Sequence, residues 1–292
     1  MSKVCENRAA IVTGAGSGLG RAYAMALAAE GASVVVNDIN GDAANGVVGE
    51  IKAAGGKAVA DTHDITNWDD AGNIVKSSIN EFGDIHAVVN NAGIVRDRMF
   101  TSMSEQEWDD VIRVHLKGHF CVTSHAARHW REQSKAGKEV SGRIINTSSA
   151  AGLQGSIAQS NYAAAKGGIA TLTIVQAAEM GRYGVTANTL APQARTGMTE
   201  KLFADMMKKP DEGFDMFDPA NVSPLVVWLA SAHSGDVTGR CFEIFGGKLS
   251  VADGWRTGPE VDKGGRWEAS EIGDAVRGII KRSVPPQKIY GT

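Results

Sequence analysis

AAIVTGAGSGLG, residues 9–20, joins a short apolar run to a glycine-rich turn and the start of a second apolar pattern. Ala9 to Thr13 is typical of a buried strand, and the spacing predicts a helix from about Leu19 to Glu30. A strand that passes through a tight glycine turn into a helix is the first unit of many α/β sheets. This stretch therefore predicts the class of the whole fold.

The glycines of this turn are spaced for close approach of the backbone to another group. The strict pattern Gly-x-Gly-x-x-Gly does not fit, but Gly14 permits a tight turn and Gly20 allows close packing of the helix. Glycines between them let the backbone approach a pyrophosphate, which the free N–H groups and the positive end of the helix dipole would bind. The residues expected to contact a dinucleotide here are Gly14, Gly16, Ser17, Gly18, Leu19 and Gly20.

Strand-like and helix-like segments alternate as far as about residue 246. Strands are expected at 33–38, 57–61, 85–90, 143–148, 185–190 and 241–245, and helices at 41–54, 67–82, 104–133, 160–182 and 218–233. The polar stretch 131–142 is expected to be a surface loop. The alternation predicts one α/β domain, residues 1–248, with a Rossmann-type doubly wound parallel sheet. Residues 249–292 show no further strand and are expected to be an extension packed on the domain or at an oligomer contact.

Composition excludes several classes of protein. The formal net charge is -3 and the 30 Lys and Arg are spread along the chain, so neither nucleic acid nor a membrane is an expected partner. No run of about 18 apolar residues occurs, and the first residues lack the apolar stretch of a secretory signal. Three cysteines without paired spacing indicate reduced thiols. We therefore expect a cytoplasmic protein.

Acidic and amide residues that follow the early strands complete the expected cofactor site. Asp38 ends the second strand, where a carboxylate can accept hydrogen bonds from a ribose and repel a 2′-phosphate. No Lys or Arg lies at 15–19 or 37–41 to neutralise such a phosphate, so NAD is preferred to NADP. Asp64 could bind the adenine amino group or could serve only as a cap. After the fourth strand, residues that could line the adenine side are Asn91, Ala92 and Gly93.

A tyrosine and a lysine share one face of the helix expected at 160–182. Tyr162 and Lys166 are four residues apart, so their side chains are neighbours. A free tyrosine has a pKa of about 10, and a nearby ammonium group favours its ionised form. Ser149 ends the preceding strand, where its hydroxyl can hold a substrate oxygen. The set predicts acid–base chemistry on an alcohol or a ketone.

Together, these motifs resemble the short-chain dehydrogenase/reductase family. Thr-Gly-x3-Gly-x-Gly at 13–20, Asn-Asn-Ala-Gly at 90–93, Ser149 and Tyr162-Ala-Ala-Ala-Lys166 follow the family's order and spacing over residues 8–246. The resemblance implies that Tyr162 is the acid/base and that Ser149 orients the carbonyl or alcohol. It also implies that Lys166 binds the nicotinamide ribose and depresses the pKa of the tyrosine. In this family the helices near 104–133 and 160–182 commonly form dimer and tetramer contacts, so a homodimer or homotetramer is expected.

One departure from the family pattern narrows the relatives. His115 stands in Val-His-Leu-Lys-Gly where the family usually has an asparagine that helps to hold a water beside the lysine. His115 could serve this relay, orient the site, or simply pack in the helix. At this histidine and at Arg96-Asp97-Arg98, the sequence resembles the dehydrogenase part of peroxisomal multifunctional enzymes of type 2. Pro192 is implied as a cofactor contact, although Gln193 follows it where many members have glycine.

Histidine pairs elsewhere on the expected helix do not form a metal motif. His115 and His119, and also His125 and His129, are four residues apart, a spacing that can bind zinc. Neither pair belongs to a His-Glu-x-x-His sequence, and no third ligand accompanies them. We therefore expect no metal.

The resemblance implies a leading function and leaves alternatives open. Members of that subgroup oxidise (3R)-hydroxyacyl-CoA with NAD in beta-oxidation, and some act on 17β-hydroxysteroids. The substrate is therefore expected to be an acyl-CoA or steroid-type small molecule, and the Met-rich segment 196–217 is expected to close over it. A catalytically idle NAD-binding protein is the alternative from another class, but both the tyrosine and the lysine that it would lack are present.

Overall fold

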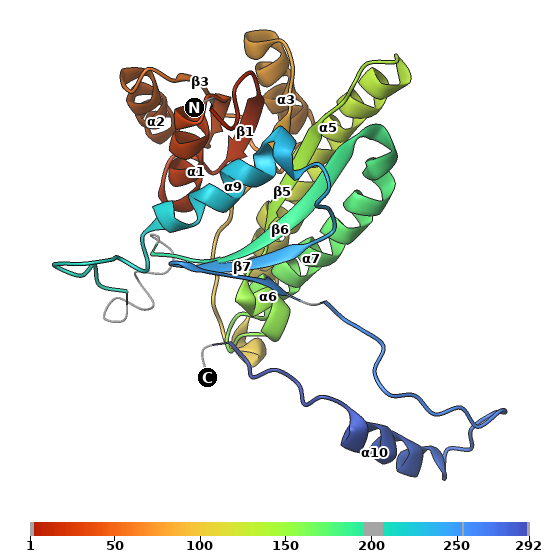
Figure 1. Cartoon of the computed structure of the whole chain (residues 1–292). Helices are drawn as coiled ribbons and strands as arrows, with labels where there is room; N and C mark the ends of the chain where they lie inside the picture. Colours follow the sequence, from red (N-terminus) through yellow and green to blue (C-terminus); the bar gives the residue numbers. More distant parts are fainter. Residues whose placement is uncertain (1–2, 196–206, 253, 291–292) are drawn as a thin grey trace.

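A computed structural model describes residues 3–195, 207–252 and 254–290 and shows one eight-stranded sheet (Figure 1). The strand order is β3-β2-β1-β4-β5-β6-β7-β8, and all neighbours pair in parallel except β7 and β8. The strands are β1 (Ala9–Thr13), β2 (Ser33–Asn37), β3 (Lys57–Asp61), β4 (Ala87–Asn90), β5 (Gly142–Thr147), β6 (Val185–Gln193), β7 (Cys241–Phe245) and β8 (Lys248–Ala252). The predicted Rossmann-type parallel sheet is confirmed.

Helices cover both faces of this sheet, and alternate residues of the central strands enter two different cores. Val12 of β1 packs among residues of α1, α2 and α9, whereas its neighbour Ile11 packs among residues of α3 and α5. A strand buried on both faces needs continuous apolar sequence, which explains the runs of β1 and β2. The helices are α1 (Gly18–Ala29), α2 (Gly41–Ala53), α3 (Trp68–Phe82), α4 (Glu105–Ile112), α5 (Gly118–Lys135), α6 (Ala150–Gln154), α7 (Ser160–Met180), α9 (Ser223–Ala230) and α10 (Ile272–Arg282).

The helix predicted near 104–133 is interrupted by a wider turn. Residues Arg113–Lys117 form a π-helical turn between α4 and α5, and His115 lies at its centre. Such turns occur most often at functional sites, because they re-aim the side chains of one helical turn. The sequence pattern did not indicate this turn.

The strand order reverses at the neighbouring strands β1 and β4. From β1 the chain proceeds outward through β2 and β3, and from β4 it proceeds to the other edge. In doubly wound sheets, ligands bind outside the carboxyl ends of the strands at this point of reversal. Thr13, Asn37, Asn90 and Thr147 end β1, β2, β4 and β5 on both sides of this point, so the next residues along the chain border the site.

The prediction that no strand follows residue 249 is wrong. Lys248–Ala252 form β8, which pairs antiparallel with β7 through a tight turn at Gly246 and Gly247. The strand is short and mostly exposed, so it lacks the buried apolar run that revealed the others. A division of the chain at 248/249 remains a prediction, although the sheet itself continues to Ala252.

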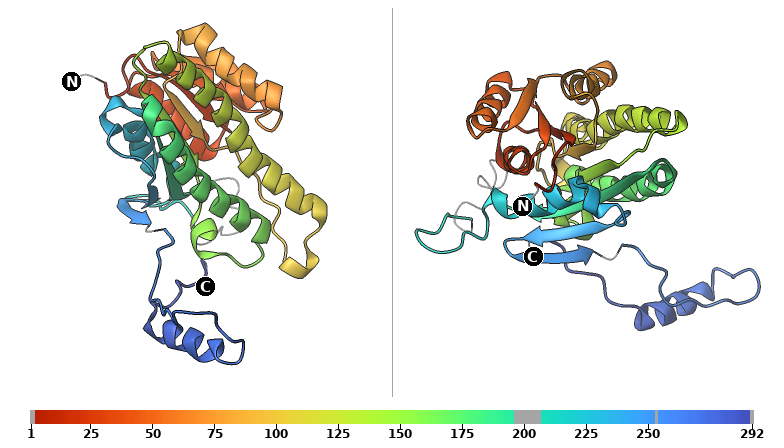
Figure 2. Two further views of the ribbon diagram at one scale, coloured as in Figure 1. Left: turned by 90° about the vertical axis from the view of Figure 1, so that its right-hand side faces the viewer. Right: turned by 45° about the horizontal axis from the view of Figure 1, so that its top comes forward.

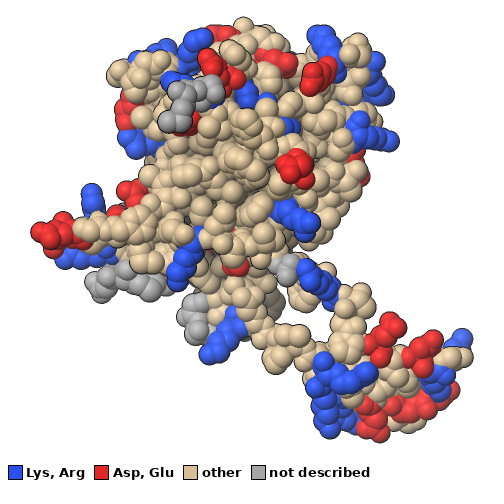
Figure 3. Space-filling model, viewed as in Figure 1, with Lys and Arg blue, Asp and Glu red and all other residues tan. Residues whose placement is uncertain are grey.

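Beyond β8 the chain leaves the body of the molecule. Residues 254–289 extend outward, carry α10 at the far end and come back beside α6 (Figures 1 and 2). No residue of α10 is buried, and Figure 3 shows charges of both signs over this arm. None of the helices in the described ranges is both long and apolar enough to span a bilayer.

Candidate active site

The turn after β1 is built so tightly that only glycine fits at two of its positions. Gly14 has a φ of +61°, and a Cβ on it would lie 2.7 Å from the Cα of Ala92. A Cβ on Gly20 would lie 2.1 Å from the carbonyl oxygen of Gly14. Real Cβ atoms do not approach backbone this closely, so these glycines allow the contact of α1 with the turn that the sequence predicted.

Asp38 is held against this turn. The Gly16 N–H donates to Asp38 Oδ2 at 2.9 Å, and the Asn40 N–H donates to Asp38 Oδ1 at 2.9 Å. Ser17 precedes α1 without a capping hydrogen bond from its side chain. A carboxylate beside a glycine turn and an uncapped helix start suits the ribose and pyrophosphate of a dinucleotide. The residues present thus fit this cofactor.

The turn after β4 is fastened to the glycine turn by Thr13, a residue that the sequence analysis did not single out. Thr13 Oγ1 accepts hydrogen bonds from the N–H groups of Asn91 at 3.0 Å and Ala92 at 3.2 Å. The Asn91 side chain donates in turn to the Thr13 carbonyl at 3.1 Å. The two predicted cofactor segments are therefore one rigid unit. Thr13 precedes the first glycine of the motif, which is the signal that could have identified it.

Asp64 and Pro192 lie at the same edge, without a contact that assigns them to a cofactor. Asp64 Oδ1 accepts from the Thr66 N–H at 2.8 Å, and Oδ2 lies 3.9 Å from Arg113 Nη1. Asp64 thus closes the turn that precedes α3, whose N-cap is Asn67. Pro192 belongs to β6, opposite Ile244 of β7, and is half-buried. Contacts of these two residues with a dinucleotide remain predictions.

The His115 side chain contacts the turn after β4 and supports it. Its Nε2 lies 2.7 Å from the Ile94 carbonyl oxygen and 3.0 Å from the Ile94 N–H, so either tautomer finds a partner. A Cβ on Gly93 would lie 2.2 Å from the imidazole, which explains the glycine there. The imidazole also meets the Tyr162 ring edge-on, with centroids 5.2 Å apart. His115 thus places the turn relative to the tyrosine.

Burial sets the protonation of the two histidines near this site. It lowers the pKa of His115 to about 3, with a smaller contribution from the positive charge of Lys166. The pKa of His119, which is fully buried, is lowered for the same reasons to well below its ordinary value. Both imidazoles are therefore neutral at physiological pH and add no positive charge beside Tyr162.

Lys166 is buried beside the catalytic ring. The residue is only 2% exposed, and its Nζ donates a hydrogen bond to the Thr147 carbonyl at 2.6 Å. The same nitrogen lies 5.6 Å from the centroid of the Tyr162 ring. Burial lowers the pKa of Lys166 to about 7, because a charged ammonium loses hydration there. The predicted neighbours are therefore brought together, with the lysine held by the end of β5.

Burial dominates the pKa of Tyr162 in the chain alone. Burial raises it to about 12, a hydrogen bond with Ser149 opposes this rise, and Asp97 and Tyr290 add to it. Lys166 is not among the groups that shift it. The effect of Lys166, together with the positive charge of a bound nicotinamide, on this pKa therefore stays a prediction. Desolvation of the phenolate outweighs what the neighbouring side chains supply.

Several buried polar side-chain atoms in this region have no hydrogen-bond partner among the described residues. They are Asn90 Oδ1, His115 Nδ1, Thr147 Oγ1 and both ring nitrogens of His119. Buried polar atoms in proteins are almost always hydrogen-bonded to protein or to ordered water. These atoms indicate a polar region inside the protein, to which the Lys166 ammonium belongs through its bond to the Thr147 carbonyl.

Two further residues tie the tyrosine helix in place. Asn161 is fully buried, and its side-chain amide donates to the carbonyls of Arg96 and Glu107, each at 3.0 Å. Gln159 donates to the carboxylate of Asp97 at 3.0 Å. These contacts fix Tyr162 against the segment after β4. A polar residue directly before the tyrosine was the only sequence signal for Asn161.

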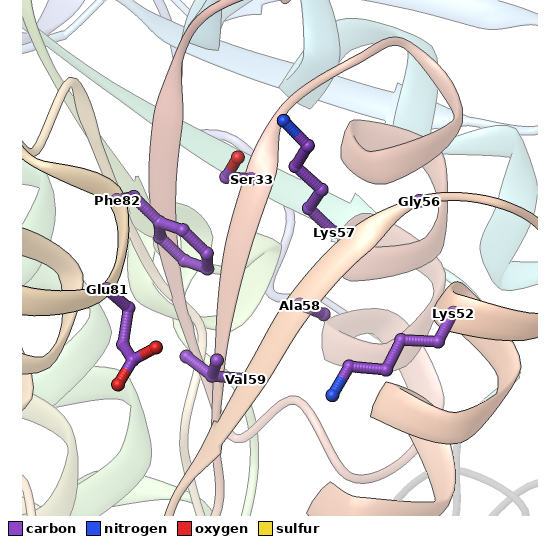
Figure 4. Close-up of a pocket in the computed structure, with 8 residues that line it drawn as sticks. All are labelled: Ser33, Lys52, Gly56, Lys57, Ala58, Val59, Glu81 and Phe82. Atoms are coloured by element: carbon purple, nitrogen blue, oxygen red, sulfur yellow. The ribbon is translucent and has the colours of Figure 1, made fainter.

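The hollow in Figure 4 lies elsewhere. It is lined by residues at the amino ends of β2 and β3 and by the end of α3, including Ser33, Lys57 and Phe82. The predicted site residues follow the carboxyl ends of the strands instead. This hollow is therefore not the catalytic site.

The other histidines predicted to be ordinary helix residues have separate partners. His125 Nε2 lies 2.9 Å from the Trp68 carbonyl oxygen, and His129 Nε2 lies 2.8 Å from Asp84 Oδ1. Within residues 3–195, 207–252 and 254–290, no three His, Cys, Asp or Glu side chains are grouped to hold a metal ion.

Comparison with known proteins gives consistent matches. A family model described as short chain dehydrogenase matches residues 8–207. Hydroxyacyl-CoA dehydrogenase ChsB1 of Mycobacterium tuberculosis is 42% identical over 98% of this chain and 93% of its own length. Peroxisomal multifunctional enzyme type 2 of Mus musculus is 43% identical over 83% of this chain, which spans 32% of that protein. A crystal structure of a short chain dehydrogenase from Mycobacterium avium is 55% identical, with a TM-score of 0.91 over 99% of this chain and 100% of that one.

Proposed function

The chain belongs to the short-chain dehydrogenase family, and from this premise we propose that it oxidises a (3R)-hydroxyacyl-CoA to the 3-ketoacyl-CoA with NAD. The observation that carries the proposal is the meeting of Ser149, Tyr162 and Lys166 at the edge of the sheet where the glycine turn also lies. This set supplies groups that suit hydride transfer from a secondary alcohol: a proton acceptor, an orienting hydroxyl and a cation.

Each of the three side chains has its own task in the proposed reaction. Tyr162 takes the proton from the substrate hydroxyl oxygen, while a hydride leaves the carbon that bears this hydroxyl and the C–O bond becomes a carbonyl. Ser149, which shares a hydrogen bond with Tyr162, holds the substrate oxygen in line. The dinucleotide supplies a hydride acceptor and, in its oxidised form, a positive charge when it is bound. Lys166 lies near enough to the Tyr162 ring to bind the neighbouring ribose and to stabilise the phenolate.

Asp38 supports the choice of NAD. Its carboxylate already faces the glycine turn, and a 2′-phosphate there would meet a negative charge. Dehydrogenases of this family use NAD or NADP, so the choice between the two cofactors depends on the charge around Asp38. We expect kcat/KM with NAD to exceed that with NADP by at least about tenfold, as a like charge in a partly buried site costs more than about 1.4 kcal/mol.

The substrate class rests on the relatives. The Mycobacterium tuberculosis protein that matches this chain along nearly its whole length is named a hydroxyacyl-CoA dehydrogenase. Part of the expected acyl-chain cover, residues 196–206, lies outside the described residues. The preferred acyl length is therefore to be measured with CoA esters of different chain length.

The test measures NADH formation with 3-hydroxyacyl-CoA esters of both configurations. We expect turnover of the (3R) series. Activity confined to the (3S) series would contradict the proposal, and turnover of a free 17β-hydroxysteroid with none of any CoA ester would favour a steroid dehydrogenase. NAD binding without turnover of any alcohol would favour an idle binding protein.

Assembly is the remaining part of the proposal. Large apolar side chains are exposed on the outer faces of α5 and α7, among them Phe120, Ile174 and Val175. Burial of such side chains between copies supports the proposed homodimer or homotetramer. Sedimentation of the purified chain tests this, and a monomer at micromolar concentration would contradict it. A cytoplasmic location stays a prediction.

A further inference from the structure

The returning end of the arm is attached to the catalytic region. Residues 284–289 are all exposed, whereas Tyr290 is half-buried. The Tyr290 N–H donates to the Gly155 carbonyl at 3.0 Å, and Tyr290 forms a parallel β-bridge with Ser156. An exposed run thus ends in a covered phenol.

The segment that Tyr290 contacts lies between two catalytic residues. Gly155 and Ser156 follow α6, which begins directly after Ser149, and they precede α7, which carries Tyr162 in its first turn. Figure 1 shows the returning part of the arm beside α6. Residues far apart in the sequence therefore meet at one wall of the site.

Electrostatics agrees with this placement. Burial raises the pKa of Tyr290, and Tyr290 is one of the groups that raise the pKa of Tyr162. Such an influence requires the two phenols to share one poorly hydrated environment. Tyr290, which is half-buried and bridged to Ser156, thus lies near enough to Tyr162 to influence its protonation.

We propose that Tyr290 is a substrate-positioning residue, whose hydroxyl donates a hydrogen bond to the thioester carbonyl of the acyl-CoA. This inference rests on the proposed function. In a 3-hydroxyacyl thioester the carbonyl at C1 is close to the hydroxyl at C3, so a second phenol near Tyr162 can reach it. Backbone contacts with Gly155 and Ser156 already anchor the chain, which leaves the side chain available for substrate.

The test compares Tyr290→Phe with Tyr183→Phe. Tyr183 is also half-buried, but it precedes β6 and so lies at the opposite edge of the sheet. Loss of one hydrogen bond predicts that KM for a 3-hydroxyacyl-CoA rises about 3- to 10-fold in Tyr290→Phe, with kcat and NAD affinity nearly unchanged. The Tyr183→Phe variant is expected to match the wild type.

Two further readouts separate substrate positioning from simple anchoring. With a secondary alcohol that lacks the carbonyl, Tyr290→Phe is expected to have no effect on KM. Because Tyr290 raises the pKa of Tyr162, its removal is also expected to move the pH limb of kcat/KM to lower pH. An unchanged KM for the CoA ester and an unchanged limb would overturn the inference, even where the wild type is active. Failure of the wild type on every CoA ester would instead reject the proposed function.

Discussion

The glycine turn and the Tyr162 region lie at the same edge of one sheet, but they are held in different ways. The turn is assembled from main chain: Gly14, Gly16 and Gly20 allow contacts that a Cβ would block, and Thr13 and Asp38 satisfy nearby N–H groups. The catalytic region is assembled from buried polar side chains, several of whose atoms have no hydrogen-bond partner among the described residues.

This difference separates shape from chemistry. The glycine turn works through its backbone geometry, so substitutions that add side-chain volume there should disrupt it. Around Lys166 and Tyr162 burial shifts the pKa values in opposite directions, down to about 7 and up to about 12. Both shifts disfavour the charged forms, so in the chain alone the phenol is protonated and the lysine is easily deprotonated near neutral pH. Substitutions at the two regions should therefore fail for different reasons.

Removal of the phenol should break the catalytic region alone. For Tyr162→Phe we expect kcat to fall by about 10²- to 10⁴-fold, since a positioned acid–base group contributes that much. NAD affinity should stay within about twofold, because the hydroxyl is not part of the glycine turn. Stopped-flow rates and calorimetric NAD binding check this, with Tyr183→Phe as the control. A variant that keeps wild-type turnover would remove Tyr162 from the reaction.

Added volume should break the turn alone. A Cβ at Gly20 would lie 2.1 Å from the Gly14 carbonyl oxygen, whereas nothing lies within 4 Å of a Cβ at Gly46 in α2. We expect Gly20→Ala to destabilise the fold by about 3 kcal/mol or more and Gly46→Ala to stabilise it by roughly 0.5–1 kcal/mol. Chemical denaturation measures both. Equal stability of the two variants would contradict the close packing.

The turn was easier to predict from sequence than the catalytic region, and the reason is physical. Glycine spacing, an apolar strand and an acid at the next strand end are local signals, and they placed Gly14 to Gly20 and Asp38 correctly in space. The grouping of Ser149, Tyr162 and Lys166 was also predicted, because two lie on one helical face and the third ends a strand.

Properties that depend on tertiary burial were not predictable. Nothing local reports that desolvation at Tyr162 exceeds the effect of its neighbours. The π-helical turn at His115 and the bridge of Tyr290 to Ser156 depend on segments that meet only in the folded chain. The sequence pattern does not predict strand β8, because an edge hairpin that is exposed to solvent needs no apolar run.

The pH dependence of stability should sharpen the contrast. The pKa of Lys166 is lowered in the folded chain from 10.5 to about 7, so between these values the unfolded chain binds the extra proton. The unfolding free energy therefore rises with pH in this window, and the contribution is lost as pH falls through about 7. From about pH 7 to about pH 9, wild type should gain on the order of 2 kcal/mol relative to Lys166→Met. Parallel curves in denaturant titrations would contradict the buried lysine.

The smallest effect is expected where the two regions meet, at His115. The imidazole bonds the Ile94 main chain and remains neutral, so an amide of similar reach can replace it. We expect His115→Asn to lower kcat/KM by less than about tenfold, whereas His115→Leu leaves both Ile94 groups unpaired at a cost of about 1–3 kcal/mol. Steady-state kinetics and thermal unfolding of both variants measure this. If His115→Asn were as inactive as Tyr162→Phe, the imidazole would itself carry a proton in the reaction. His115 would then belong to the catalytic region and not to the support of the turn.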